Sequence, residues 1–156
     1  MRSKAKIAAG LLIAGAVAFL LIQLVPYGRA HDNPPVVSEP QWSSPQTRQL
    51  AVRACFDCHS NETAWPWYTS VAPVSWLVQR DVAEGREVLN FSEWRSGGEG
   101  EETEELAEVV LEGGMPPTTY LPLHPEARLS AAEKRQLANG LLAMAGGERE
   151  HEADDD

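Results

Sequence analysis

The chain has 156 residues and a formal net charge of −10. This length suits one folded domain and is short for two. All 23 acidic residues but only nine of the 13 lysines and arginines lie after residue 30. Such an acidic surface repels phosphate backbones, which argues against nucleic-acid binding and favours solubility or a basic partner protein.

The N-terminal segment has the composition of a membrane anchor. Three basic residues precede an apolar run over residues 7–25, in which Gln23 is the only strongly polar side chain. In a helix that rises about 1.5 Å per residue, this run matches the hydrocarbon core of a bilayer. Because basic flanks stay in the cytoplasm, residues 1–28 are predicted to anchor the chain in the inner membrane, with the rest outside the cytoplasm. The alternative is a signal peptide cleaved after Ala30, although the apolar run exceeds the usual length of such a region.

The remainder of the chain is predicted to be all-α. Residues 29–45 are rich in proline and are expected to form an extended tether. Residues 46–146 form the expected domain, with long loops and no strand-like alternation, and residues 147–156 form an acidic tail that is expected to be disordered. Apolar residues at helical spacing predict helices over residues 46–59, 74–89, 101–111 and 130–145. The last of these begins with a capping box, Ser130-x-x-Glu133.

One motif in the chain indicates a specific chemistry. Its only two cysteines stand in Cys55-Phe56-Asp57-Cys58-His59, which has the form C-x-x-C-H. On a helix, two thiols three residues apart lie on the same side. This spacing lets both thiols bond to vinyl groups on one edge of a porphyrin, and it places His59 beneath the iron as an axial ligand. The motif therefore predicts one covalently attached haem c on Cys55, Cys58 and His59.

Two other sites use closely spaced cysteines. A thioredoxin-like redox pair would be expected within a β-α-β pattern, which this sequence lacks. A closed zinc site needs four ligands, and no second Cys/His pair stands at zinc-finger spacing. Haem attachment is favoured over both, and the predicted export agrees with it, because covalent haem is normally added outside the cytoplasm.

Met115 is the first candidate for the sixth iron ligand. It lies in Gly-Gly-Met-Pro-Pro, residues 113–117, where glycines let the backbone approach a porphyrin and prolines fix the loop without amide partners. A Met ligand would raise the reduction potential relative to a second His. The alternative role of Met115 is to fill a gap in the core. His124 is the runner-up as ligand, while the remaining candidates are expected to lie in the core or in solvent: Met144, His31 and His151.

Several short stretches carry a resemblance to a known family. They are Asn33-Pro34-Pro35-Val36, the C-x-x-C-H motif with Ser60-Asn61-Glu62-Thr63, Trp65-Pro66-Trp67-Tyr68, Pro73-Val74-Ser75-Trp76, Gly114-Met115-Pro116-Pro117 and His124-Pro125. Over residues 33–140 the chain resembles the small haem-binding domain family of membrane-tethered bacterial c-type cytochromes. The resemblance implies a cytochrome-c-like all-α fold with one haem, and it implies that residues 33–36 belong to the domain.

These observations predict a monohaem c-type cytochrome domain that transfers electrons outside the cytoplasm. Its partners are expected to be redox proteins, basic ones in particular, and no catalytic residue is assigned. The alternative function is a haem peroxidase module or a haem sensor, either of which requires an open or exchangeable sixth position on the iron.

Overall fold

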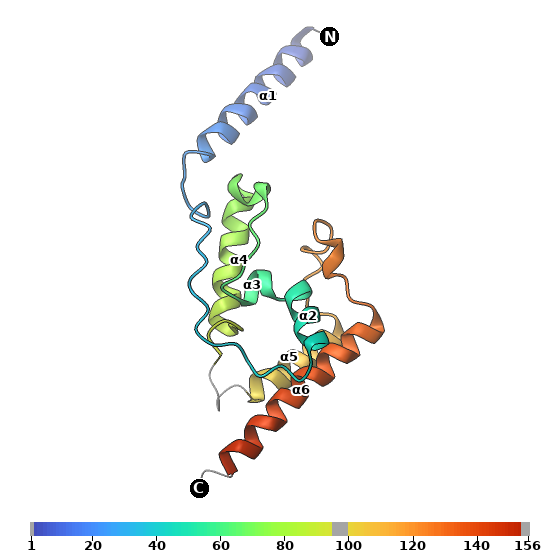
Figure 1. Ribbon diagram of the computed structural model, residues 1–156. Helices are drawn as coiled ribbons and strands as arrows, with labels where there is room; N and C mark the ends of the chain where they lie inside the picture. Colours follow the sequence, from blue (N-terminus) through green and yellow to red (C-terminus); the bar gives the residue numbers. More distant parts are fainter. Residues whose placement is uncertain (1, 95–99, 154–156) are drawn as a thin grey trace. The chain divides into compact units, whose positions relative to one another are not determined.

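A computed structural model describes residues 2–94 and 100–153 (Figure 1). Within these residues the structure has no β-strand, and a single isolated bridge joins Ser38 to Glu93. The prediction of an all-α chain with long loops after an apolar N-terminal helix is confirmed. The elements in chain order are α1 Arg2–Ile22, α2 Pro45–Ala54, α3 Phe56–His59, the 3-10 helix η1 Trp67–Ser70, α4 Val74–Val88, α5 Gly100–Glu112, the 3-10 helix η2 Pro125–Ala127 and α6 Ala131–Ala153.

The chain forms two compact units. The first contains residues 1–32 and 64–83, and the second contains residues 33–63 and 84–156. The boundary between them falls inside α4. The predicted division into anchor, tether, domain and tail follows chain order, whereas these units group segments that are distant in the sequence.

The first unit joins the segment after α1 to the loop before α4. Helix α1 contains a span, Lys4–Ile22, that is long and apolar enough to cross a membrane, as either an anchor or a signal sequence would be. Directly after it, the Gln23 side chain donates to the Ala72 carbonyl at 2.9 Å and accepts from the Ala72 amide at 3.0 Å. His31 stacks on the Trp65 ring at 4.7 Å, although sequence reasoning placed it in solvent.

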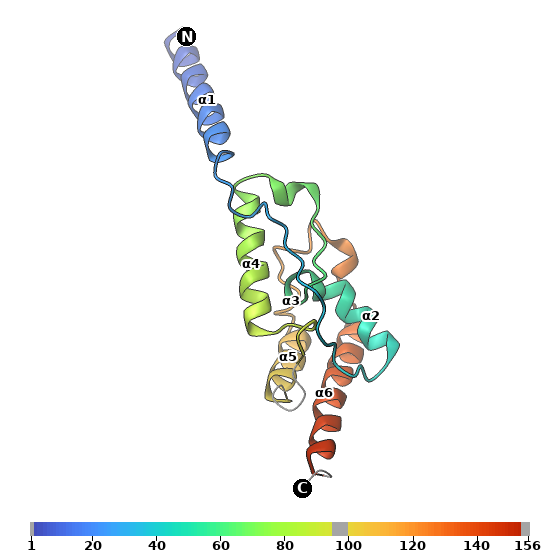
Figure 2. The ribbon, with the colours of Figure 1, turned by 60° about the vertical axis from the view of Figure 1, so that its left-hand side comes forward.

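The second unit has its core between α2, α5 and α6. Helices α5 and α6 lie side by side, and α2 packs against α6 (Figures 1 and 2). At that contact Gly140 of α6 is buried against the Thr47 side chain, in space that a Cβ atom would fill. The core combines these helices with aromatic side chains from the loops, and its most buried members include Phe56, Phe91, Val110, Leu137 and Leu141.

Two predicted helices differ from those in the structure. The helix expected over residues 46–59 is interrupted at Cys55, whose φ of −126° and ψ of −34° end α2 and precede α3. The capping box at Ser130 is present, but α6 continues to Ala153. The expected disordered tail is therefore helical through residue 153, while residues 154–156 lie outside the described residues. Adding residues such as Ala, Glu and Arg to a capped helix costs little free energy, because the unfavourable nucleation step has already taken place.

Candidate functional site

The three residues of the predicted attachment motif lie on a single turn. The Cys58 amide donates to the Cys55 carbonyl at 3.1 Å, and the His59 amide donates to the same carbonyl at 2.9 Å. Cys55 is buried, Cys58 is partly exposed and His59 is buried. The structure thus places all three residues on one turn, while their role as attachment residues stays a prediction.

The buried thiol does not have the character of a redox nucleophile. Burial, and secondarily the charge of Cys58, raises the pKa of the Cys55 thiol to about 12. Thioredoxin-like pairs work through a thiolate with a depressed pKa. The raised pKa of Cys55 is the opposite of that depressed value, which disfavours the redox-pair alternative.

The His59 ring is oriented by a backbone carbonyl. Its Nδ1 lies 3.1 Å from the Leu89 carbonyl oxygen, which can only accept a hydrogen bond. Nδ1 must therefore carry the proton, so that the Nε2 lone pair remains for a metal. Burial lowers the pKa of His59, opposed by backbone hydrogen bonds with Leu89 and Gly85. The ring is thus held in its neutral form, which is the form that binds iron.

Gly85 lets α4 lie directly against the motif. A Cβ atom at this position would stand 2.6 Å from the Cys58 carbonyl oxygen, closer than real side chains come. The Leu89 carbonyl, one turn later, is then placed to accept the hydrogen bond from His59 Nδ1–H. Sequence reasoning did not identify Gly85 or Leu89 as site residues, although a glycine inside a helical pattern was an available signal.

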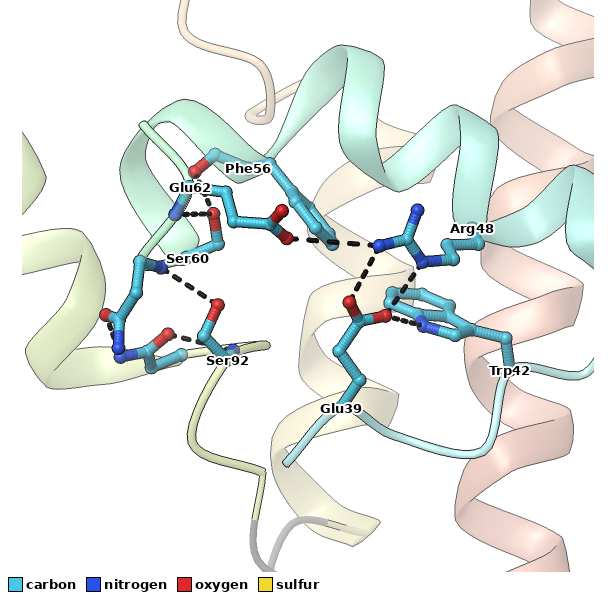
Figure 3. A network of polar contacts seen from close by, with 9 residues as sticks. Glu39, Trp42, Arg48, Phe56, Ser60, Glu62 and Ser92 are labelled. Atoms are coloured by element: carbon cyan, nitrogen blue, oxygen red, sulfur yellow. Dashed lines mark hydrogen bonds and ion pairs between the residues drawn. The ribbon is translucent and has the colours of Figure 1, made fainter. Parts of the chain in front are cut away.

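The residues that follow the motif are fixed by a buried polar network. Ser60 Oγ donates to the Phe56 carbonyl at 2.8 Å and accepts from the Glu62 amide at 3.0 Å (Figure 3). The Asn61 amide donates to Ser92 Oγ at 2.9 Å, and Arg86 Nε donates to the Ser60 carbonyl at 2.8 Å. Since Ser60 and Asn61 are almost fully buried, this network holds the end of the motif in one conformation.

Part of the expected tether packs within the same unit as the motif. Asn33 Nδ2 donates to the Thr63 carbonyl at 2.9 Å, and Asn61 Nδ2 donates to the Pro35 carbonyl at 3.1 Å. Further along, the Val37 amide donates to the Ser92 carbonyl at 2.8 Å. Residues 33–38 therefore line the network around the motif.

A second polar cluster ties this segment to α2. The Glu39 carboxylate accepts from Trp42 Nε1 at 2.9 Å and from two Arg48 nitrogens at 2.7 Å each (Figure 3). The hydrogen bonds from Arg48, more than those from Trp42, lower the pKa of Glu39. The Arg48 guanidinium also lies 5.6 Å from the centre of the Phe56 ring. The Glu39–Arg48 cluster therefore contacts the C-x-x-C-H motif through the Phe56 side chain.

Met115 emerges from the end of α5. Gly113, at φ +85°, turns the chain out of the helix, and the amides of Gly113 and Gly114 donate to the Val109 carbonyl at 3.1 and 2.9 Å. Met115 is half-buried, packs against the core and lines a cavity of about 410 Å³ together with Leu121 and other residues of its loop. The cysteines and His59 are not among the described residues that line this cavity. Met115 as an iron ligand therefore stays a prediction.

The loop that carries Met115 and His124 reaches the motif through Asp57. Tyr120 Oη donates to Asp57 Oδ2 at 2.5 Å, and its ring stacks on His124 with ring centres 3.8 Å apart. His124 Nδ1 lies 3.1 Å from Glu126 Oε1 and 3.9 Å from Asp57 Oδ2. Burial, and then the bond to Asp57, raises the pKa of Tyr120. Sequence reasoning missed Tyr120, because no local pattern predicts a contact between residues this far apart.

The donor set fits a haem better than an isolated metal ion. Among the residues that the structure describes, no three His, Cys, Asp or Glu side chains gather closely enough to hold a metal by themselves. An iron bound to His59 would need most of its ligands from elsewhere, as a porphyrin provides them. A neutral, oriented imidazole is the protein group that such an iron would need, and two thiols on the same turn are the groups that covalent attachment would use.

Comparison with known proteins agrees with this fit. A sequence model described as a haem-binding domain matches residues 17–143, a range that includes the C-x-x-C-H motif, Met115 and His124. No curated protein and no solved structure matches the chain.

Proposed function

This chain belongs to the haem-binding domain family and is a haem-binding protein, and we propose that it is a monohaem c-type cytochrome domain that transfers electrons outside the cytoplasm. The observation that carries the proposal is the turn of Cys55, Cys58 and His59, with His59 Nδ1 bonded to the Leu89 carbonyl. Family membership supports haem, and this turn supports covalent attachment.

Each residue of the turn has a separate role in the proposal. Cys55 and Cys58 would hold the haem through two thioethers, each formed by addition of an S–H group across one vinyl C=C bond, which needs no external oxidant. His59 would bind the iron through Nε2, with its ring kept oriented by the Leu89 carbonyl. Met115, with His124 as the alternative, would be the second protein ligand. The bound haem supplies a one-electron iron couple.

Contacts after α1 support a retained anchor rather than a cleaved signal peptide. Cleavage after Ala30 would remove Gln23 from its paired hydrogen bonds with Ala72. It would also remove Gly28, which is buried against the Ser75 carbonyl. With the basic N-terminus in the cytoplasm, the haem domain lies on the outer side of the inner membrane.

The acidic surface supports a basic redox partner. On α5 the side chains of Glu104, Glu105, Glu108 and Glu112 are all exposed. Such a field speeds encounter with cations and slows encounter with anions, and salt weakens both effects. Reduction by hexaammineruthenium should therefore slow as salt is added, and equal salt dependence with ferrocyanide would contradict this role.

The test is a redox-titrated visible spectrum of the full-length protein, made in a host that matures c-type cytochromes. We expect one reversible one-electron transition and haem that resists extraction by acidified acetone. Cys55→Ala and Cys58→Ala should each leave at most one thioether, and the double variant should release its haem. Haem that is fully extractable from the unsubstituted protein would contradict covalent attachment.

The same preparation separates the electron carrier from the alternative functions. A peroxidase or a gas sensor needs an exchangeable sixth position, so that its reduced form would bind carbon monoxide rapidly. An electron carrier with Met115 or His124 on the iron should bind carbon monoxide slowly or not at all. Rapid binding together with peroxide turnover would replace the proposed function.

A further inference from the structure

The loop of residues 65–77, in which we include η1 and the first turn of α4, is attached to the point where the chain leaves α1. Besides the paired Gln23–Ala72 bonds, Ser75 Oγ donates to the Tyr27 carbonyl at 3.5 Å. Gly28, at φ +79°, lies so close to the Ser75 carbonyl that no side chain would fit. Both ribbon views place η1 and the start of α4 beside the chain that follows α1 (Figures 1 and 2). This loop therefore stands at the outer end of the apolar helix.

The same loop differs from the rest of the exported chain in charge. Residues 64–79 contain no Asp, Glu, Lys or Arg, and residues 7–28 contain none either. Arg80 and Arg29 are the first charged residues after these two stretches. In a chain with 23 acidic residues, two uncharged stretches that contact one another form a surface distinct from the acidic remainder.

Large apolar side chains are exposed on this uncharged surface. Trp67 is 80% exposed, Leu77 is 54% exposed and Leu24 is 78% exposed. Trp67 forms an edge-to-face pair with Tyr68, with ring centres 6.0 Å apart. Large apolar side chains exposed on an uncharged stretch suit an interaction surface better than contact with water. Trp and Tyr are also the residues that concentrate where a bilayer meets water.

We propose that residues 65–77 lie in the phospholipid headgroup region of the bilayer that α1 crosses, with Trp67 as the residue that enters the lipid. The inference rests on the membrane anchoring in the proposed function and adds a second contact with the same bilayer. A lipid bilayer is the partner that we infer for this surface, because its residues are hydrogen-bonded to the chain directly after the helix that can span the membrane. The arginines that border the uncharged stretches then face lipid phosphates.

The test uses the full-length protein in nanodiscs of phosphatidylethanolamine and phosphatidylglycerol. Trp67→p-benzoylphenylalanine is irradiated, and lipid adducts are detected by mass spectrometry. Leu24→p-benzoylphenylalanine, directly after α1, reports the anchor alone. Leu142→p-benzoylphenylalanine, on an exposed position of α6 in the second unit, is the matched control. Hydroxyl-radical footprinting of the unsubstituted protein provides a readout that no variant can disturb.

The expected result is lipid adducts at positions 24 and 67, none at 142, and protection of Trp67 from hydroxyl radicals despite its exposure. Adducts at 24 but not at 67, with Trp67 readily oxidised, would overturn the inference and leave the anchor intact. Equal adducts at 67 and 142 would also overturn it. A mature protein that begins after Ala30 would show that the anchor fails, and the inference would fail with it.

Discussion

Individual side chains in this protein owe their roles to partners that are distant in the sequence. His59 is oriented by the Leu89 carbonyl, thirty residues away. Asp57, inside the C-x-x-C-H motif, accepts a hydrogen bond from Tyr120, 63 residues away. The motif therefore places the two thiols and the imidazole along the chain, whereas the orientation of the His59 ring and the approach of the Met115 loop depend on the fold.

Met115→Ala should remove the weak sulfur–iron charge-transfer band. The midpoint potential should fall by on the order of 0.1 V, a small part of the roughly 0.8 V range that axial ligands span. Met144→Ala is the control, because Met144 of α6 is 5% exposed and packs in the hydrophobic core. That variant should keep the band and lose about 2 to 5 kcal/mol of unfolding free energy. An unchanged spectrum in Met115→Ala would transfer the ligand role to His124.

Tyr120→Phe should loosen the loop that carries Met115 and His124. A hydrogen bond to a charged partner contributes about 1.5 to 3 kcal/mol, and the partial exposure of Asp57 places this one toward the lower value. We expect a lower urea midpoint and faster binding of added imidazole by the oxidised protein. Tyr27→Phe is the control, since Tyr27 is 52% exposed. Identical imidazole kinetics in both variants would show that the Asp57 bond does not hold this loop.

At the scale of elements, close contacts between helices surround the motif. Gly85→Ala tests the contact between α4 and α3. Alanine normally stabilises a helix relative to glycine, by roughly 0.5 to 1 kcal/mol. Here the added Cβ would meet the Cys58 carbonyl at 2.6 Å, so we expect a loss of about 1 to 3 kcal/mol in urea unfolding instead. Gly15→Ala, inside α1 with open space around its Cβ position, should not lower the midpoint. A gain in stability at Gly85 would contradict the close contact.

Glu133 links the N-terminus of α6 to α2 and should make stability depend on pH. The Ser130 amide, and then Arg53, lowers the pKa of this carboxyl to about 2 from an ordinary 4.5. Its contribution is therefore fully present above about pH 4.5 and is lost as the pH falls from 4.5 toward 2. The difference in urea midpoint between the unsubstituted protein and Glu133→Gln should shrink over that interval. A urea-midpoint difference that stays constant down to pH 2 would refute the role of the Glu133 carboxylate in stability.

Local signals in the sequence predicted some elements well. The capping box at Ser130 and the helical spacing before Val88 depend on residues within a few positions of each other. The break at Cys55 was not predicted, because the apolar pattern continues through it. The helical residues after 146 were not predicted either, because their acidic composition resembles that of a disordered tail while their conformation follows from the helix before them.

The candidate site shows the same division between local and distant information. Cys55, Cys58 and His59 are neighbours along the chain, so their shared turn could be predicted. Gly85, Leu89 and Tyr120 come to the motif from other elements, and one sequence does not reveal which loops meet. The family resemblance implied that residues 33–36 belong to the domain, whereas the proline content of residues 29–45 indicated a tether; the contact of this segment with Asn61 was not predicted.

At the scale of the whole molecule, one chain combines an apolar helix that can span a membrane with an acidic haem-binding domain. The first unit contains that helix and the uncharged loop attached to its end, and the second contains the motif and its network. Our proposals assign contact with the bilayer to the first unit and haem chemistry to the second, so that each proposal has its own test.

The most direct test of the central proposal is the intact mass of the full-length protein, made in a host that attaches haem to c-type cytochromes. We predict the mass of the polypeptide plus one haem, surviving denaturation, and the bare polypeptide mass for the Cys55→Ala, Cys58→Ala double variant. The bare mass for the unsubstituted protein, in a host that matures a control cytochrome, would contradict covalent attachment and the function built on it.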